Sequence, residues 1–452
     1  MARRLTSWIG EFAASPMSAQ SAERARCILL DSLGCALLAS GDDKARPVFQ
    51  ALPRLGGGTD CTIIGSHARG ALPVAALANG ALIRLLDLND TYTGRRQIGH
   101  PSDNIGVALA AAEIGNRSGG ALLAAIRLGY EIYGRVLDLG DAENPWDHVT
   151  ASGLVTAGVV GWLLEFSPDQ VTNALALAAL HCATLGEVRV GKISGAKAIA
   201  NAVVASTACT LALLAAQGVT GPESALEGRR GFAALILQGA DFAGFFDARG
   251  EDRLLSTGLK QYPCFALAQG PLSAAIELRG RLPENAAIER LTIALADTGP
   301  ARLRLNDQHG RQPTSSEAAD HSIYFLVAAA LRDGRFGLDQ LHGERWRDRD
   351  VTDLIARTDA VIDPALGPKA ALPCRLEAEL SVGGRVVVER PCTPGFASSP
   401  LSWDEVVAKF RNCARGVLDD ARQDRVIAAV RGLERLASVR TLLECLVSKA
   451  AA

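Results

Sequence analysis

The stretch from Leu86 to Asn104 gathers side chains that could do acid–base chemistry. It holds three carboxylates, two threonines, two arginines and a histidine between two apolar runs. Such a polar junction costs desolvation energy unless its groups pair with one another or hold a ligand. We expect Asp87 to orient a histidine or lysine, Thr91 to bind a carboxylate, and His100 to carry protons or bind a carboxylate. Asp87 and Thr91 would share a face if the preceding helix continued that far. The alternative is a capped loop between two helices.

Two further segments carry candidate proton carriers. His148 precedes a long apolar run, and at a helix N-terminus the dipole would keep it neutral and available as a base; the alternative is simple capping. Lys197 is followed by more than twenty uncharged residues, so we expect it to be partly desolvated. Lys192 is interpreted as a solvated charge. The fork of Arg189 could clamp a carboxylate, or it could be a surface arginine.

The elements that must position these groups are mostly helical. Apolar residues recur at helical spacing in nearly every long segment before about residue 250, whereas IERLTIALAD and CRLEAELSVGGRVVVER alternate as strands do. The spacing also predicts a helix from about Ser315 to Leu331. We therefore expect a mostly α protein, in which a large all-helical domain is interrupted by a smaller α+β domain. The expected ranges are 1–255 for the first part of the helical domain, 256–392 for the α+β lid domain and 393–452 for the helices that complete the helical domain.

The composition narrows the class of protein. The chain has 452 residues, with 47 Lys+Arg against 49 Asp+Glu. This near-balance argues against a nucleic-acid or membrane-surface protein but permits a small acidic substrate. No two of the ten cysteines form a C-x-x-C, so we expect no metal site and no cofactor. Residues 198–217 are interpreted as a buried core helix, not a membrane span, and the protein is expected to be cytoplasmic.

Several segments in order along the whole chain carry a family resemblance. The segment DLNDTYTGRRQIGHPSDN resembles the D-F-N-D-T-(W/Y)-L…H-P-S-D-N motif of the MmgE/PrpD family. The other matching segments are DHVTASGLVTAGVV (147–160), VRVGKISGAKAIANA (188–202), GVTGPESALEGRRGF (218–232), LKQYPC (259–264), EAADHSIYFLVAAAL (317–331) and PLSWDEVVAKF (400–410). Counting back from GVTGP without a gap places Lys197, not Lys192, on the family's lysine.

The resemblance implies a cofactor-independent lyase close to the 2-methylcitrate dehydratase branch, with its active site between the two domains. Decarboxylation or epimerisation of a related carboxylate is the alternative, and a silent carboxylate-binding homologue is the alternative of another class. The resemblance also implies a homodimer formed through the helical domain. The implied catalytic residues are His148, Lys197, Asp87, His100 and Lys260; the implied substrate-binding residues are Thr91, Arg189, Gln269, His321 and Tyr324.

The chain departs from the family pattern on one side of the site. Many relatives carry a histidine five or seven residues after the lysine that matches Lys260, where this chain has Phe265 and Leu267. The family's tyrosine usually falls four residues after the histidine of the A-D-H-S segment, where this chain has Phe325, with Tyr324 one residue earlier. These departures leave the substrate and the reaction type open.

Overall fold

The computed structural model describes residues 1–95, 97–141, 144–190, 193–247, 250, 252–305, 308–367 and 369–447. The protein is mostly α-helical and divides into two compact units. The helical unit comprises Met1–Val188, Ala196–Thr257 and Ser402–Ala452, and the α+β unit comprises Arg189–Gly195 and Gly258–Leu401. Each unit is described by itself below.

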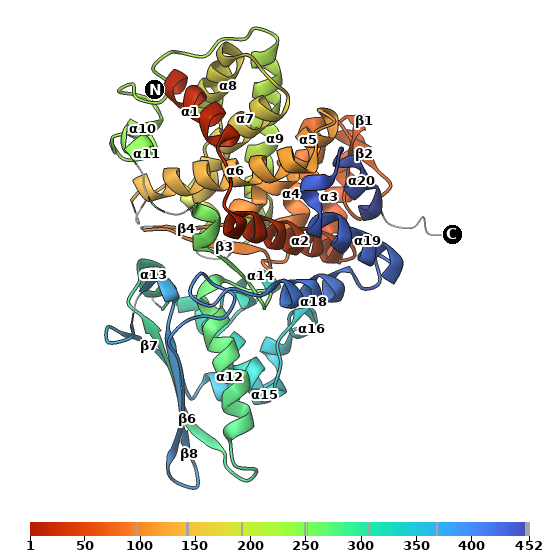
Figure 1. The fold of residues 1–452 in the computed structure, drawn as a ribbon. Helices are drawn as coiled ribbons and strands as arrows, with labels where there is room; N and C mark the ends of the chain where they lie inside the picture. The colour runs from red at the N-terminus through yellow and green to blue at the C-terminus, as the bar shows by residue number, and fades with distance from the viewer. Residues whose placement is uncertain are drawn as a thin grey trace. The chain divides into compact units, whose positions relative to one another are not determined.

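The helical unit is a bundle of α-helices with a few short strands (Figure 1). Its α-helices are α1 (Ala2–Ala14), α2 (Ala19–Ser40), α3 (Arg46–Ala51), α4 (Leu72–Arg84), α5 (Ile105–Ile114), α6 (Gly119–Leu139), α7 (Ala151–Leu163), α8 (Pro168–His181), α9 (Ala196–Ala216), α10 (Phe232–Leu235), α11 (Gly244–Asp247), α18 (Trp403–Ala414), α19 (Asp420–Arg431) and α20 (Arg440–Leu443). Its short 3-10 helices include η3 (Pro101–Asn104), η4 (His148–Thr150) and η6 (Arg253–Ser256). Its short strands are β1 (Gly57–Thr62), β2 (Arg69–Gly70), β3 (Asp90–Thr93) and β4 (Ile98–Gly99), and β5 (Thr257–Leu259) begins at its last residue before the α+β unit.

Helix α4 leads into the candidate segment and is packed closely by its neighbours α5 and α9. Glycines permit this approach: a Cβ built on Gly106 of α5 would lie only 2.7 Å from the backbone nitrogen of Gly80 in α4. A Cβ on Gly80 would in turn lie 3.6 Å from Cα of Ala202 in α9. Small residues therefore bring three helix backbones together beneath the segment that follows α4.

The condition under which Asp87 and Thr91 would share a helix face is not met. Helix α4 ends at Arg84, Asp87 takes a left-handed backbone conformation with φ of 50°, and Thr91 lies in β3, which pairs antiparallel with β4. Aspartate is among the few residues that tolerate this conformation, and it ends the helical path. Thr91 and Asp87 therefore do not share a helix face.

The C-terminal helices complete the helical unit. Helix α18 lies along α2, although almost the whole chain separates them (Figure 1). A Cβ on Gly34 of α2 would lie 3.3 Å from Cα of Phe410 in α18. The ammonium of Lys409, also on α18, pairs with Asp31 at 2.6 Å and donates to the carbonyl oxygen of Leu88 at 2.9 Å. The spacing Ser402-x-x-Glu405 is typical of a capping box, and α18 opens with one.

Helix α9 contains the uncharged stretch noted in the sequence. It is the one helix among the described residues that is long and apolar enough to cross a membrane by length and composition, and half of its most apolar window is buried inside the protein. It packs against α4, α7 and α8, which agrees with a core helix.

The α+β unit is built on a four-stranded sheet in the order β7-β6-β8-β9, in which β6 and β7 are parallel and the other pairs antiparallel. Helix α12 packs on this sheet and α15 packs on α12 (Figure 1). The predicted strands are confirmed, and two of them form a hairpin: the backbone N–H of Gly383 donates to the carbonyl of Leu380, and the N–H of Leu380 donates to the carbonyl of Gly384. Gly383 and Gly384 have φ of 81° and 82°, which glycine adopts without strain. The strands are β6 (Ile288–Ala296), β7 (Thr358–Asp363), β8 (Cys374–Leu380) and β9 (Arg385–Arg390); the α-helices are α12 (Gln269–Arg281), α13 (Gly299–Leu305), α14 (Ser316–Ala319), α15 (Ile323–Asp333), α16 (Leu338–His342) and α17 (Arg349–Ile355).

The single helix expected from about Ser315 to Leu331 is instead two helices. Helix α14 ends at Ala319 and α15 begins at Ile323, after Ser322, whose side chain caps it by accepting from the backbone of Phe325. A serine cap can start a new helix wherever its hydroxyl reaches the N3 amide. The break leaves Asp320 and His321 outside regular helix.

Candidate active-site residues

A buried ion cluster follows α4 in the helical unit. Asp87 accepts from Nζ of Lys197 at 2.9 Å and from a guanidinium nitrogen of Arg84 at 2.5 Å. The exposed fraction is 2% for Asp87, 6% for Lys197 and 2% for Arg84. Burial of charges is costly unless they pair. The expectation that Asp87 orients a lysine therefore agrees with this geometry.

A second set of polar groups continues from this cluster. Asn89 donates to Oδ1 of Asp103 and to the hydroxyl of Ser102, both at 2.9 Å. The Ser102 hydroxyl donates to Asp90 at 2.6 Å, and Asp103 lies 3.8 Å from Nε of Arg84. The Pro-Ser-Asp sequence before the next helix favours Ser102 or Asp103 as its cap, but α5 has Asn104 at the N-cap position and no side-chain cap. The side chains of Ser102 and Asp103 bond within the network instead.

Asp90 is the fully buried centre of this network. Burial raises the pKa of Asp90 to about 6, although hydrogen bonds from Ser102 and Tyr130 oppose the rise. The hydroxyl of Tyr130 donates to Asp90 Oδ2 at 2.6 Å. Burial also raises the pKa of Tyr130, so the phenol keeps the proton that it donates.

His100 is held at the entry to η3, in the non-helical conformation that its following proline predicts. Its Nδ1 lies 2.6 Å from the carbonyl oxygen of Asp90. Because a carbonyl only accepts, Nδ1 carries the proton, and in the neutral ring the lone pair is on Nε2. His100 is thus arranged as a base at Nε2.

His148 lies at the first position of η4, immediately before α7. Its Nδ1 is 2.6 Å from the hydroxyl of Tyr133, and that hydroxyl also accepts from the backbone N–H of His100 at 3.2 Å. We assign the single phenol proton to the bond with His148, which places the proton of the neutral His148 ring on Nε2. Asp147 caps η4 by accepting from Val149, and its carboxylate is 3.8 Å from Nε2 of His148.

These contacts join four of the predicted groups, Asp87, Lys197, His100 and His148, into two neighbouring arrangements. The ring centroids of His100 and His148 are 5.4 Å apart, and the Asp87–Lys197 pair connects to Asp90, and so to His100, through the bonds described above. Thr91 follows Asp90 in β3; it is fully buried, and its hydroxyl has no hydrogen-bond partner in the described part of the chain. A buried hydroxyl without a protein partner is well placed to form a hydrogen bond with an oxygen atom of a ligand.

The structure describes only the position of Arg189 in the fold. Arg189 is the last residue of the short 3-10 helix Gly186–Arg189 and is half-buried. Lys192 lies outside the described residues. The carboxylate-clamp role of Arg189 stays a prediction.

The α+β unit carries its own buried lysine. Lys260 is fully buried, directly after β5. The amide of Gln269 holds the loop that follows this lysine: its Oε1 accepts from the backbone N–H groups of Gln261 and Tyr262 at 2.9 and 3.1 Å, and its Nε2 donates to the Tyr262 carbonyl at 2.9 Å. Because both ends of the amide are occupied, we assign Gln269 to positioning this loop instead of to binding substrate.

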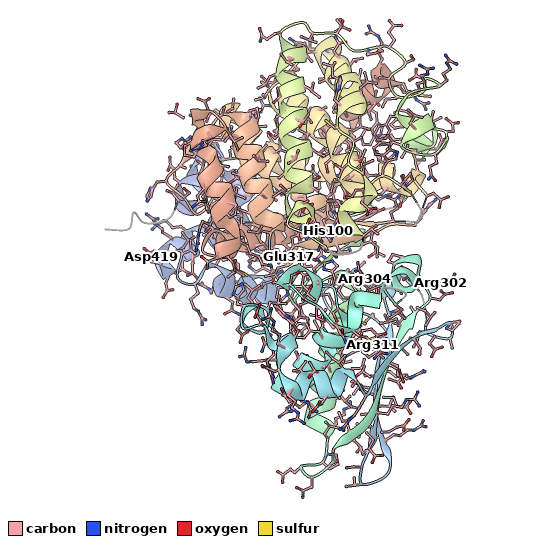
Figure 2. The ribbon with its side chains drawn as sticks, turned by 180° about the vertical axis from the view of Figure 1, so that it is seen from behind. His100, Arg302, Arg304, Arg311, Glu317 and Asp419 are labelled. Carbon is pink, nitrogen blue, oxygen red and sulfur yellow. The ribbon has the colours of Figure 1, made fainter. Side chains whose placement is uncertain are left out.

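His321 lies at the break between α14 and α15, where its Nδ1 bonds the carboxylate of Asp320. Its ring stacks on Phe265, with centroids 5.4 Å apart and planes 24° apart. The guanidinium of Arg304 lies 5.6 Å from the centroid of the Phe265 ring; Figure 2 shows Arg304 and Arg311 in the same part of the α+β unit. The phenylalanine that replaces the family's histidine therefore supports a histidine and faces a cation.

Tyr324 and Phe325 point to different surroundings on α15. Tyr324 is 6% exposed, and the guanidinium of Arg311 lies 4.2 Å from its ring centroid. Phe325 is fully buried against the rings of Phe336 and Trp346, both at 5.9 Å. Phe325 is thus a core residue, and Tyr324 is the member of the pair whose ring meets a charged group.

Sequence reasoning missed Arg84, Tyr133 and Arg304. Tyr133 reaches the two histidines because a glycine precedes His100: a Cβ on Gly99 would lie 2.6 Å from the Tyr133 hydroxyl. A glycine directly before a histidine in a polar segment is a signal that could have pointed to close approach of another chain segment. Arg84, the last residue of α4, could have been noticed as a charge at the end of an apolar run.

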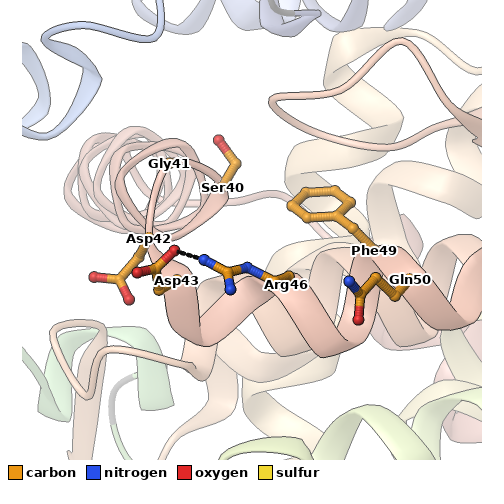
Figure 3. A pocket seen from close by; sticks show the side chains of 7 residues that line it. All are labelled: Ser40, Gly41, Asp42, Asp43, Arg46, Phe49 and Gln50. Carbon is orange, nitrogen blue, oxygen red and sulfur yellow. Dashed lines mark hydrogen bonds and ion pairs between the residues drawn. The ribbon is translucent and has the colours of Figure 1, made fainter.

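A separate surface hollow of about 420 Å³ lies after α2 (Figure 3). Its charged groups are occupied locally: Asp42 caps a short helix by accepting from Lys44, and Asp43 pairs with Arg46. The hollow contains none of the predicted catalytic residues, so we do not place the chemistry there.

The fold and these residues define a class: two-unit, mostly helical proteins with neighbouring imidazoles and buried lysines. Comparison identifies the family. The model of the MmgE/PrpD N-terminal domain matches residues 3–244 and that of the MmgE/PrpD C-terminal domain matches residues 262–435, so the chain belongs to the MmgE/PrpD family.

Curated relatives of this chain are named for two reactions. A 2-methylcitrate dehydratase of Cupriavidus necator is 33% identical over 370 residues, covering 76% of this chain and 74% of the relative. A 2-methylcitrate dehydratase of Salmonella typhimurium is 31% identical over 405 residues, covering 82% and 81%. A cis-aconitate decarboxylase of Aspergillus terreus is 25% identical over 476 residues, covering 97% and 94%. The relatives are thus lyases acting on small carboxylates.

Proposed function

We propose that this protein is a lyase that eliminates water from a small hydroxy di- or tricarboxylate, as its relatives named 2-methylcitrate dehydratase do. The observation that carries the proposal is the pair of imidazoles, His100 and His148, with opposite assigned tautomers and ring centroids 5.4 Å apart. An elimination needs one group that takes a proton and one that gives a proton, and this pair supplies both.

In the proposed reaction Nε2 of His100 removes the proton next to a substrate carboxylate. The electrons of that C–H bond form the C=C bond, the C–O bond breaks, and Nε2–H of His148 protonates the departing hydroxyl so that it leaves as water. The sequence instead predicted His148 as the base; the bond from Tyr133 to its Nδ1 favours the donor role.

Negative charge develops on the substrate carboxylate during proton removal, and positioned cations stabilise it. Lys197, fixed by Asp87 at 2.9 Å, is the proposed cation of the helical unit, and the buried hydroxyl of Thr91 is the proposed carboxylate contact. Substrate or catalytic roles for Lys260, His321, Tyr324 and Arg189 are proposals that rest on the family resemblance.

Decarboxylation of a cis-aconitate-like acid is the second candidate, favoured by the decarboxylases that align with 97% of this chain. The same groups would then stabilise the charge left when carbon dioxide departs, and a protonated side chain would supply the replacing proton.

Incubation with citrate, methylcitrate, cis-aconitate and hydroxysuccinate analogues in deuterated water, followed by NMR, separates these reactions. New vinyl protons from a hydroxy acid support dehydration, release of carbon dioxide shows decarboxylation, and deuterium uptake alone shows epimerisation. Binding of several of these acids without any turnover would mean a silent carboxylate-binding homologue and would overturn the proposal.

A further inference from the structure

Two neighbouring helices of the helical unit, α7 and α9, carry three deeply buried polar side chains whose polar atoms have no protein partner among the described residues. They are Ser152 and Thr156 on α7, both fully buried, and Asn201 on α9, which is 1% exposed. Within the described residues, the two hydroxyls and both ends of the Asn201 amide have no hydrogen-bond partner. We call these three residues the polar seam. Burying such groups without partners is unfavourable, so their lack of protein partners points to a bound ligand.

The two hydroxyls of the seam are one turn apart, so they share a face of α7. Two other faces of that helix are identified by their neighbours: a Cβ on Gly129 of α6 would lie 3.3 Å from Val155, and a Cβ on Gly153 would lie 2.5 Å from Cβ of Cys182, just after α8. The hydroxyls lie between these two faces. The other helices packed on α7 are α1, α5 and α9. Helix α1 meets α7 at Gly158, where a Cβ would lie 2.9 Å from Ile9, so α5 and α9 remain for the side that carries the hydroxyls.

The amide of the seam reaches the same region from α9. Asn201 is one turn beyond Lys197, between residues whose neighbours are known. Ala202 lies against Gly80 of α4, and the carbonyl of Val204 accepts from the Cys182 thiol at the end of α8. Asn201 therefore faces between α4 and α8, and α7 is the helix packed against α9 on that side.

The usual way to satisfy a buried helical hydroxyl is not used here. On α2 the fully buried Ser32 donates to the carbonyl of Ile28 at 2.8 Å, the bond to the preceding turn that such residues often make. Ser152 and Thr156 do not make that bond. The seam combines donors and acceptors and carries no charge, which fits water better than an ion.

We propose that Ser152, Thr156 and Asn201 bind ordered water inside the helical unit, bridging α7 and α9. The site lies one turn from Lys197 along α9, so the water contributes to holding the helix that carries this lysine against the helix that follows His148. This binding does not depend on the reaction proposed above.

Oxygen-17 magnetic relaxation dispersion, which detects water held longer than the protein's tumbling time, tests the proposal on the full-length protein. Ser152→Ala, Thr156→Val and Asn201→Leu should each reduce the long-lived water by at least one molecule. Ser32→Ala is the matched control, because its hydroxyl bonds the protein itself, and it should leave the count unchanged. An unchanged count in all three seam variants would overturn the proposal.

The stability of the Asn201→Leu variant gives a second readout, because bound water and an unpaired amide predict opposite changes. If water is bound, Asn201→Leu removes its hydrogen bonds and should lower the urea midpoint; if the amide is truly unpaired, the substitution removes a burial cost and should raise the midpoint. A raised midpoint overturns the proposal. Should Asn201→Leu fail to fold, the water counts of the nearly isosteric Ser152→Ala and Thr156→Val decide.

Discussion

The imidazole rings of His100 and His148 lie 5.4 Å apart, and one hydroxyl, that of Tyr133, bonds the backbone of the first and the ring of the second. Residues 48 positions apart are thereby fixed by a single side chain from α6. A shared hydroxyl couples the orientation of the two rings, because displacing it affects both.

Removing this hydroxyl is therefore expected to impair turnover without unfolding the protein. Tyr133→Phe should lower kcat by about tenfold or more, below the full loss of a proton carrier, and should change the shape of the pH–rate profile. Tyr92→Phe is the matched control, since its hydroxyl bonds Asp138 instead, and it should leave the profile unchanged. An unaltered profile for Tyr133→Phe would contradict the assigned role.

Lys197→Met should lower turnover by at least ~10²-fold, the scale for losing a positioned charge or proton carrier. The variant should remain folded, because Asp87 keeps its bond to Arg84. Lys192→Met, measured beside it, should change turnover little. Were Lys192→Met the damaging change, the register that places Lys197 on the family's lysine would be wrong.

Asp90 should make the protein less stable as the pH rises from about 4 to 6. Its pKa is about 6 in the folded state and about 3.9 in the unfolded chain, so in this window the unfolded state loses its proton first. The free energy of unfolding of the wild type, relative to Asp90→Asn, should fall by about 3 kcal/mol over this range and then level off. Urea unfolding at several pH values measures this difference; a difference that rises with pH would contradict the assignment.

We predict a homodimer formed through the helical unit. Helix α9 exposes an apolar stripe, comprising Ile199, Val203, Leu213 and Leu214, that a partner could cover. Val203→Glu combined with Leu214→Glu should yield a monomeric mass in light scattering at micromolar concentration. Val382→Glu, at an exposed apolar residue of the β8–β9 hairpin, should leave the dimer intact. A monomeric wild type would refute the prediction.

Activity should survive prolonged treatment with chelators. The chain has no C-x-x-C, and the proposed proton transfers use side chains alone. Turnover before and after EDTA or a stronger chelator checks this. Loss of activity that iron or another divalent metal restores would show a metal requirement.

The local features of the fold were predictable where neighbouring residues decide them. A capping serine before a helix, as at Ser167 and Ser402, and a glycine pair between two alternating segments, as at Gly383 and Gly384, are short-range signals. The structure has both serine caps and the hairpin. The end of α4 was not predictable in this way, because Lys197, 110 residues away in the sequence, holds Asp87 in its left-handed conformation. Distant partners of this kind leave no periodicity in the sequence.

The candidate residues show the same division. His100 and His148 were found from the sequence, because their residue types and the family motifs mark them. Tyr133 was not, because α6 reads as an ordinary apolar helix and only the folded chain brings its hydroxyl to both histidines. The role of Phe265 likewise becomes visible only through its stacking on His321.

The contacts of Lys409 have a consequence for biosynthesis. The Leu88 carbonyl lies 321 residues before the lysine that bonds it. At about 5–20 residues per second, a ribosome would need roughly 20–60 s to deliver that partner. Until then the surface of α2 around Gly34 has no α18 to cover it, and the segment beginning at Asp87 lacks one of its anchors. The nascent chain thus lacks this cover for most of its synthesis, and exposed apolar surface of this kind favours aggregation. A stop codon placed before α18 would leave that surface permanently uncovered.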